Sequence, residues 1–336
     1  MTLSLRRILV LTFFPLALFG QQNLFPILGG QRVGTSVFTF LKIGASARAA
    51  GMGEAVVALH QDASSLFYNP AAIGQLSGTQ LSASRVQWPA DVTYDFLGIS
   101  HHLAGSHYLG LSAGILHMAP MKETTEYLPY GTGNYFIFQD QFIGLSYSVK
   151  MSNRFTFGIT LKHVEENLAG NRMRSMLLDV GTFYWTGFRT FRFSAVLSNF
   201  GPQARPEGSF ERFILDRETG DEVIIDSEFE LFSPPTIFRV GSAMEVIESQ
   251  NHSVTVSLQL NHPVDNAENM VAGIEYLFLN TLALRGGYKI NVEEEDFSVG
   301  AGFYVPVGPA KLRVDFAYTN MIHLSDPTRL SLAVEF

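Results

Sequence analysis

The stretch RFTFGITLKHV, residues 154–164, alternates between two kinds of side chain at every step. Its apolar positions are Phe155, Phe157, Ile159 and Leu161, and between them stand Thr156, Gly158, Thr160 and Lys162. Successive side chains of a β-strand point to opposite faces, so a period of two indicates a strand with one apolar and one polar face. The same alternation recurs in SVTVSLQL (253–260), AKLRVDFAYT (310–319) and RLSLAVEF (329–336).

Similar segments follow one another from residue 78 to the last residue. We distinguish about fourteen, and most have about the 9 to 11 residues that a tilted membrane-spanning strand needs. They begin near residues 78, 91, 106, 136, 154, 172, 189, 236, 251, 267, 281, 294, 309 and 328. The sequence therefore predicts an all-β fold with about fourteen strands in an antiparallel, up-and-down order.

The connections alternate between short and long. Tight turns occur at 104–106, 151–153, 186–188, 248–251, 279–280 and 306–308. The connections between them are mostly longer and polar, the longest being Met118–Asn134 and Gly201–Pro235, and the short QWPA at 87–90 is the exception. Outer-membrane barrels have short periplasmic turns, longer extracellular loops and an even number of strands. The terminal Phe336 on an alternating strand resembles the usual end of such barrels, where it serves as the assembly signal.

The composition supports a barrel in a membrane. Charged residues make up only 16% of the chain and there are 28 phenylalanines, against roughly 25% charged residues in a typical globular domain. A closed barrel pairs every backbone donor in lipid, because closure removes the unpaired edges of an open sheet. The charged residues of the last strands would then face the lumen: Lys311, Arg313, Asp315, Arg329 and Glu335. The alternative is a soluble two-sheet protein with the same alternation.

The N-terminal residues predict that the protein is exported by way of a signal peptide. The apolar run Ile8–Phe19 follows Arg6 and Arg7 and is interrupted by Pro15, which fits a signal peptide over residues 1–20, whereas a spanning helix needs about 20 apolar residues. The chain has no cysteine, which excludes disulfides, thiolate metal sites and lipoprotein acylation. A net charge of −8, from 23 Lys and Arg against 31 Asp and Glu, argues against a nucleic-acid partner.

Before the first strand, the segment FLKIGASARAAGMGEAVVALHQDASSLFYNPAAIGQL (40–76) resembles the N-terminal signature of the PorV/PorQ family, a branch of the FadL-like outer-membrane barrels. The matching residues are Phe40, Leu41, Gly44, Ala47, Arg48, Gly51, Met52, Gly53, Asp62, Ala63, Asn69, Pro70 and Ala71. The resemblance implies a fourteen-stranded barrel over residues 77–336, with residues 21–76 folded into the lumen as a hatch.

Within this predicted hatch, Asn69 and Pro70 form a helix start, since Asn caps free backbone N–H groups and Pro fits the first helical position. Arg48, Glu54 and Asp62 would pair with lumen charges that would otherwise be buried alone. We expect the hatch residues Arg48, Gly51, Gly53, Asp62, Asn69, Pro70 and Ala71 to be structural, with direct ligand contact as the alternative for the polar ones.

Two functions are compatible with this resemblance. A PorV-like protein would be an accessory of the type IX secretion system, with outer-membrane lipids around it and with the translocon, the cargo's C-terminal domain and the attachment complex as partners. A FadL-like protein would instead carry a hydrophobic ligand across the outer membrane. The sequence shows no catalytic set, cofactor motif or metal-ligand spacing, so we expect no enzyme activity, no cofactor and no metal.

The two long connections are the candidate sites of partner contact. Gly201–Pro235 carries nine acidic residues against three arginines and many apolar side chains, a content that argues against an idle solvated loop. We expect the two connections to form an apolar cap with an acidic rim, whose contact residues would be Met121, Tyr127, Leu128, Tyr130, Phe210, Phe213, Phe229 and Phe232. The alternative is that both fold over the barrel mouth as a lid.

Overall fold

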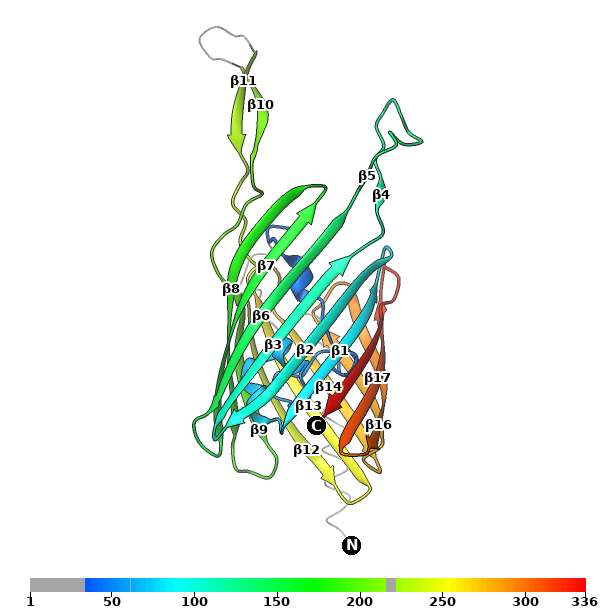
Figure 1. Cartoon of the computed structure of the whole chain (residues 1–336). Coiled ribbons are helices and arrows are strands. Elements are labelled where there is room, and N and C mark those ends of the chain that lie inside the picture. The colour runs from blue at the N-terminus through cyan, green and yellow to red at the C-terminus, as the bar shows by residue number, and fades with distance from the viewer. Residues whose placement is uncertain (1–33, 61, 216–221) are drawn as a thin grey trace.

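The computed structural model describes residues 34–60, 62–215 and 222–336, and its dominant feature is a closed antiparallel barrel of fourteen strands (Figure 1). The predicted fold is therefore confirmed, and each barrel strand begins within three residues of its predicted start. The predicted signal peptide, residues 1–20, lies outside the described residues. The barrel strands are β1 (Thr79–Trp88), β2 (Val92–Ala104), β3 (His107–His117), β6 (Phe138–Lys150), β7 (Phe155–Leu168), β8 (Asn171–Trp185), β9 (Arg192–Phe200), β12 (Ile237–Glu248), β13 (His252–Pro263), β14 (Asn269–Phe278), β15 (Leu282–Ile290), β16 (Glu295–Val307), β17 (Ala310–Met321) and β18 (Thr328–Glu335).

Neighbouring strands in sequence are neighbours in the wall, and the first and last strands close it. In the closing pair, Gln80 of β1 lies opposite Glu335 of β18. The backbone N–H of Phe336 donates to the carbonyl oxygen of Thr79 at 2.9 Å, which extends this pairing to the last residue. A closed ladder leaves no strand edge exposed to hydrocarbon, which is the condition for a sheet to span a membrane.

The two faces of the wall differ in the way that the alternation predicts. Large apolar side chains are exposed on the outer face, among them Leu97, Leu111, Ile143, Leu145, Leu161, Ile274, Phe316 and Leu332. Small polar side chains are buried on the inner face, among them Ser82, Ser100, Ser112, Ser146, Thr160 and Ser257. The charged residues of the last strands also face inward: Asp315 and Arg329 are buried, and Lys311 and Arg313 pair with Glu335.

The long connections project from one end of the barrel and the tight turns lie at the other, where the chain ends (Figure 1). Two separate two-stranded sheets form these projections, β4 (Met121–Lys122) with β5 (Tyr135–Phe136) and β10 (Ser209–Leu215) with β11 (Glu222–Glu228). The exceptional short connection between β1 and β2 is a tight turn in which Ala90 and Asp91 both have positive φ, 62° and 57°.

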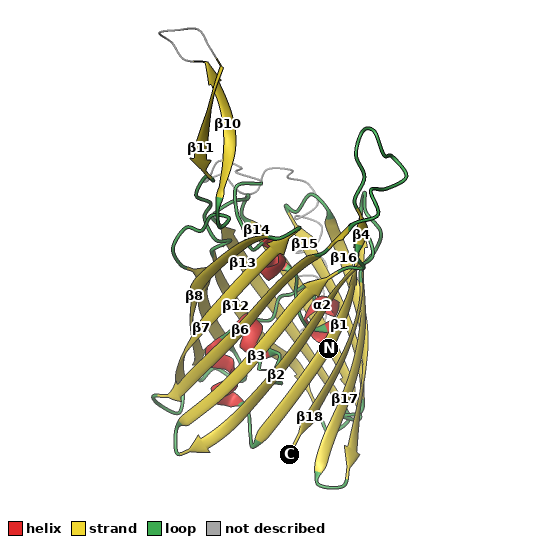
Figure 2. Ribbon diagram, turned by 45° about the horizontal axis from the view of Figure 1, so that its top comes forward, coloured by secondary structure: helices red, strands yellow, loops and turns green. Residues whose placement is uncertain are grey.

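The short helices all precede β1 and lie inside the barrel (Figure 2). They are η1 (Thr39–Lys42), α2 (Ala47–Gly51), α3 (Ser65–Tyr68) and η2 (Pro70–Gln75). Helix α2 packs on β15 to β18, whereas η2 packs on β6 to β8. Residues 34–76, called the hatch below, thus reach across the lumen. None of the helices in the described part of the chain is long and apolar enough to cross a membrane.

Candidate functional site: the barrel lumen and its mouth

The hatch backbone touches the barrel wall at glycines that face the lumen. A Cβ atom on Gly273 of β14 would lie only 2.6 Å from the carbonyl oxygen of Met52, and one on Gly287 of β15 would overlap the backbone of Gly53. Gly158 and Gly181 receive the Asn69–Ala71 turn in the same way on the other side. These wall glycines were not identified from the sequence, because a glycine within an alternating strand does not indicate which distant segment approaches it.

Ion pairs join α2 of the hatch to the wall. Arg48 donates two hydrogen bonds to Glu275, at 2.9 and 2.6 Å, and the wall residue Arg285 donates to the same carboxylate at 2.6 Å. Arg285 also donates to Asp315 at 2.7 Å, so the buried charges form one alternating network. Because each buried charge needs an opposite partner, the loss of Arg48 would leave Arg285 to balance two carboxylates.

The remaining polar hatch residues act mainly within the hatch. The side chain of Asn69 caps η2, accepting from the Ala71 N–H at 2.9 Å, and its amide donates to the Val57 carbonyl at 2.8 Å. Glu54 lies 3.7 Å from Arg329 of the wall. The expected ion pair of Asp62 is wrong for the described residues: its carboxylate instead accepts from the Ser64 N–H at 2.7 Å, which orders the turn before α3.

On one side of the lumen mouth, a polar cavity of about 200 Å³ separates the hatch from strands β12 to β16. Its wall presents the carboxamides Gln259, Asn261 and Asn269 together with the charged groups Arg239, Lys289 and Glu295. The hatch contributes Lys42, Glu54, Phe67 and Tyr68 to the lining. Ile237, Val271 and Val292 also line it, so the cavity is suited to a solute that has a polar or charged group and a short apolar part.

On the other side, an apolar cavity of about 430 Å³ lies between the hatch and strands β1, β2, β3 and β6. It is lined by Phe40, Ile43, Trp88, Val92, Leu116 and Phe138, with Asp140 as a wall carboxylate. Below it lies an aromatic cluster in which Phe40 contacts both Tyr94 and Phe142, each with ring centroids 6.4 Å apart. Lys42 of η1 and Glu295 of β16 line both cavities, so the two cavities adjoin at these residues.

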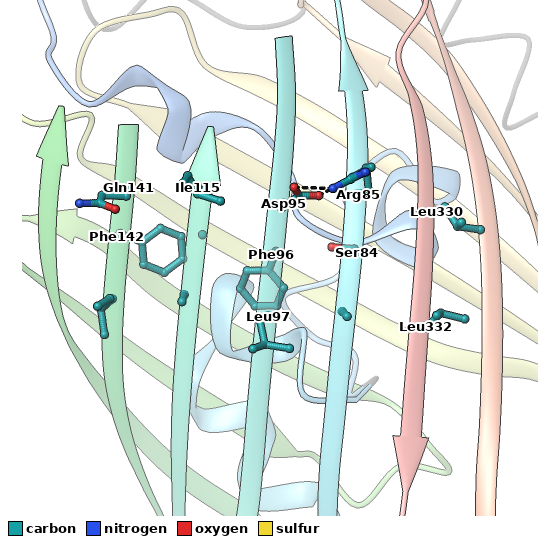
Figure 3. A pocket seen from close by; sticks show the side chains of 14 residues that line it. Ser84, Arg85, Asp95, Phe96, Leu97, Ile115, Gln141, Phe142, Leu330 and Leu332 are labelled. Atoms are coloured by element: carbon teal, nitrogen blue, oxygen red, sulfur yellow. Dashed lines mark hydrogen bonds and ion pairs between the residues drawn. The ribbon is translucent and has the colours of Figure 1, made fainter. Parts of the chain in front are cut away.

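The barrel also has a groove of about 500 Å³ on its outer face, across β18, β1, β2, β3 and β6 (Figure 3). Leu97, Ile115, Leu330 and Leu332 line it, and an ion pair between Arg85 and Asp95 lies at its upper end. The strands keep a regular register there, with Arg85 opposite Asp95 and Phe96 opposite Gly114. The groove is thus a depression in the lipid-facing surface, and the ladder beneath it is continuous.

The predicted partner-contact residues do not come together. The β4–β5 and β10–β11 projections stand apart on opposite sides of the mouth (Figures 1 and 2), so their described residues form neither the expected common cap nor a lid. Tyr127 and Tyr130 are 89% and 91% exposed and Phe213 is 65% exposed. Leu128 and Phe210 are exposed, whereas Met121 and Phe229 are half-buried, and Phe229 stacks obliquely on Phe210.

Phe232 does not belong to an exposed contact surface. Its backbone pairs with Ala204, and its side chain packs against the buried core at the barrel mouth. The neighbouring Ser233 forms a bridge with Ser36 of the hatch. The base of this long connection therefore holds the upper end of the hatch, and β10 and β11 extend away from that base (Figure 1).

No protein-family model matches the sequence, and none of the curated proteins matches it. Solved structures with the same fold include the CymD monoaromatic hydrocarbon channel, with a TM-score of 0.58 and 13% identity over 87% of this chain and 97% of that one. The toluene transporter TodX of P. putida has a TM-score of 0.56 and 12% identity, covering 92% and 98% of the two chains. The toluene transporter TbuX of Ralstonia pickettii has a TM-score of 0.56 and 11% identity, covering 93% and 99%.

These similarities, together with the topology, establish the fold as a closed barrel of fourteen strands like those of the CymD and TodX barrels. They do not show that the chain belongs to the PorV/PorQ family, whose N-terminal signature the hatch sequence resembles. Among the described residues, no group of three or more His, Asp or Glu side chains is placed to hold a metal ion. The mouth of the barrel therefore offers two adjoining cavities for non-covalent binding, one mainly apolar and one polar. Both are lined in part by the hatch, which packs closely against the wall.

Proposed function

We propose that this chain resides in the outer membrane and admits small apolar molecules through the apolar cavity at its mouth. The observation that carries the proposal is the cavity itself, about 430 Å³ with a mainly aliphatic and aromatic lining. Pockets of about 300 to 1,000 Å³ with such linings are typical of small-molecule sites. The names of the structural neighbours, which are hydrocarbon channels and toluene transporters, support the same class of solute.

Binding at the mouth would come from removal of apolar surface from water, worth about 25 cal/mol per Å². Phe40, Trp88 and Phe138 offer ring faces and edges to an aromatic solute. Further passage requires the hatch to move, because its backbone lies directly against Gly273 and Gly287. The proposal therefore places capture at the mouth and makes hatch displacement the later step. It favours the transport alternative over the secretion role.

Trp88 provides a direct test of capture. The chain has two tryptophans, and Trp185→Phe leaves Trp88 in the cavity wall as the sole reporter. In this background, toluene added to the mature chain in detergent micelles is expected to change the Trp88 emission saturably. Val92→Phe fills the cavity and is expected to weaken the response by about tenfold, while Val254→Phe, on the outer face of β13, is the matched control. An unsaturable response, or equal responses of the two variants, would contradict capture in this cavity.

A second function, docking of a protein partner as the PorV/PorQ resemblance implies, is favoured by one observation. The β10–β11 hairpin projects from the mouth and exposes Phe210, Phe213 and Ile224 to solvent. Exposed apolar clusters of this kind often mark protein contacts. We propose that secreted cargo or a translocon component would bind there.

The test replaces residues 208–230 with a short Gly-Ser linker. Because the base of the connection at Ala204 and Phe232 stays in place, the barrel and hatch are expected to assemble normally. A docking role predicts that co-purification of partners and surface delivery of cargo are lost. Unchanged capture and delivery would rule out the hairpin as the docking surface.

A further inference from the structure

The polar cavity at the lumen mouth contains hydrogen-bond donors with no partner among the described residues. Arg239 of β12, Asn261 of β13 and Asn269 of β14 lie side by side in one row of the wall. All three line the cavity, opposite the hatch residues Glu54 and Tyr68. The row is thus a continuous polar surface that faces a space large enough for a small solute.

A relay of carboxamides fixes the orientation of Asn269. The backbone N–H groups of Val56 and Val57 donate to Oε1 of Gln259, so its Nε2 must point away from them and donates to Asn261 Oδ1 at 2.7 Å. Asn261 Nδ2 in turn donates to Asn269 Oδ1 at 2.7 Å. The relay therefore ends with the Nδ2 group of Asn269, a donor with no acceptor in the described part of the chain.

Arg239 has most of its donors free. Its only hydrogen bond among the described residues runs from Nη1 to the Ser198 hydroxyl at 3.0 Å. The other charged groups around the cavity are engaged in ion pairs: Lys42 with Asp265, Lys289 with Glu295, and Glu54 with Arg329. Arg239 forms no ion pair with any described residue, so the cavity retains one positive charge in excess.

We infer that this cavity binds a small carboxylate. A carboxylate offers only acceptors, matches the planar fork of the Arg239 guanidinium with two parallel hydrogen bonds, and balances the single excess charge. The Asn269 Nδ2 group supplies a further donor to the same anion. A volume of about 200 Å³ limits the ligand to a few carbon atoms beside the carboxylate. The cavity adjoins the apolar cavity at Lys42 and Glu295, but the inference does not depend on the proposed transport of apolar molecules.

The experiment measures binding of radiolabelled propionate to the mature chain in detergent micelles by equilibrium dialysis, with propionamide as the neutral competitor of the same shape. We expect saturable propionate binding that propionamide displaces poorly. Arg239→Gln is expected to weaken binding by about tenfold or more, because charge-assisted hydrogen bonds are lost, and Asn269→Leu is expected to weaken it by a smaller factor. Arg313→Gln, which alters a lumen arginine paired with Glu335 near the opposite end, should leave binding unchanged.

Heat-modifiable migration on electrophoresis establishes that each variant forms a closed barrel. If Arg239→Gln does not fold, Arg239→Lys keeps the charge but lacks the fork, and is expected to bind propionate more weakly than the unmodified chain. The inference is overturned if the unmodified chain binds no propionate saturably, if propionamide competes as well as propionate, or if folded Arg239→Gln binds as well as the unmodified chain. The competition experiment needs no variant, so it decides the matter in every case.

Discussion

Replacement of a lumen-facing glycine should release the hatch without opening the barrel wall. A Cβ atom on Gly273 would lie 2.6 Å from the Met52 carbonyl oxygen and 3.0 Å from the Met52 Cβ. Ordinary contacts of a Cβ begin at 3.4 Å, so in Gly273→Ala the hatch backbone must retreat by about 0.8 Å. Overpacking of this kind costs about 1–3 kcal/mol. If the hatch alone relaxes, the population of displaced hatch rises by about 5- to 150-fold.

The matched control is Gly286→Ala on the neighbouring strand β15. Gly286 faces outward, and the nearest atom to its Cβ would be Ile274 Cγ2 at 3.6 Å, which is ordinary contact. Liposome swelling with small neutral solutes measures leakage, and heat-modifiable migration reports the barrel. We expect Gly273→Ala to leak more than Gly286→Ala while both barrels stay closed. Equal leakage of the two variants would refute the packing of Met52 against β14.

Two more predictions concern the hatch. Asn69→Ala removes the cap of η2 and leaves the buried Ala71 N–H without its acceptor, which should destabilise the seated hatch by about 1–3 kcal/mol. Leakage through the barrel should therefore rise, and unchanged leakage would show that the cap does not hold the hatch. Burial lowers the pKa of His60 to about 4, so the folded hatch takes up fewer protons than the unfolded one and should lose stability as the pH falls from about 6.5 to about 4. Leakage should therefore rise as the pH falls over this range, and His60→Phe should reduce the rise. The same pH profile of leakage in the unmodified chain and in the His60→Phe variant would contradict this role of His60.

The barrel was predictable because lipid and lumen impose opposite demands on successive residues. Leu145 and Leu161 face outward while Ser146 and Thr160 face the interior, the alternation that the two environments of a barrel wall impose. The capped start of η2 was predictable for a local reason, since Asn69 and Pro70 suffice to define it. The β10–β11 projection lies in water and has no such constraint. The sequence predicted an apolar cap with an acidic rim there, but not that β10 and β11 project away from the other long connection.

The site was less predictable because it depends on contacts between distant parts of the chain. The apolar cavity joins η1 of the hatch to Trp88, Leu116 and Phe138 on three different wall strands. Each of these residues fits an alternating strand whether or not it lines a cavity. Phe232 was misassigned for the same reason, since an apolar side chain in a long connection can contact a partner or the chain's own core. The row formed by Arg239, Asn261 and Asn269 was likewise not predictable, because it exists only once the register of β12, β13 and β14 is known.

The rate of toluene uptake by cells tests the central claim most directly. Cells that lack a hydrocarbon transporter of their own would express the full chain, the Val92→Phe variant or the Val254→Phe variant at equal levels in the outer membrane. The account predicts that the unmodified chain raises the initial uptake rate above that of cells without it, that Val92→Phe removes most of this increase, and that Val254→Phe keeps it. Uptake no faster than in cells without the chain, or an increase that Val92→Phe leaves intact, would contradict entry through the apolar cavity.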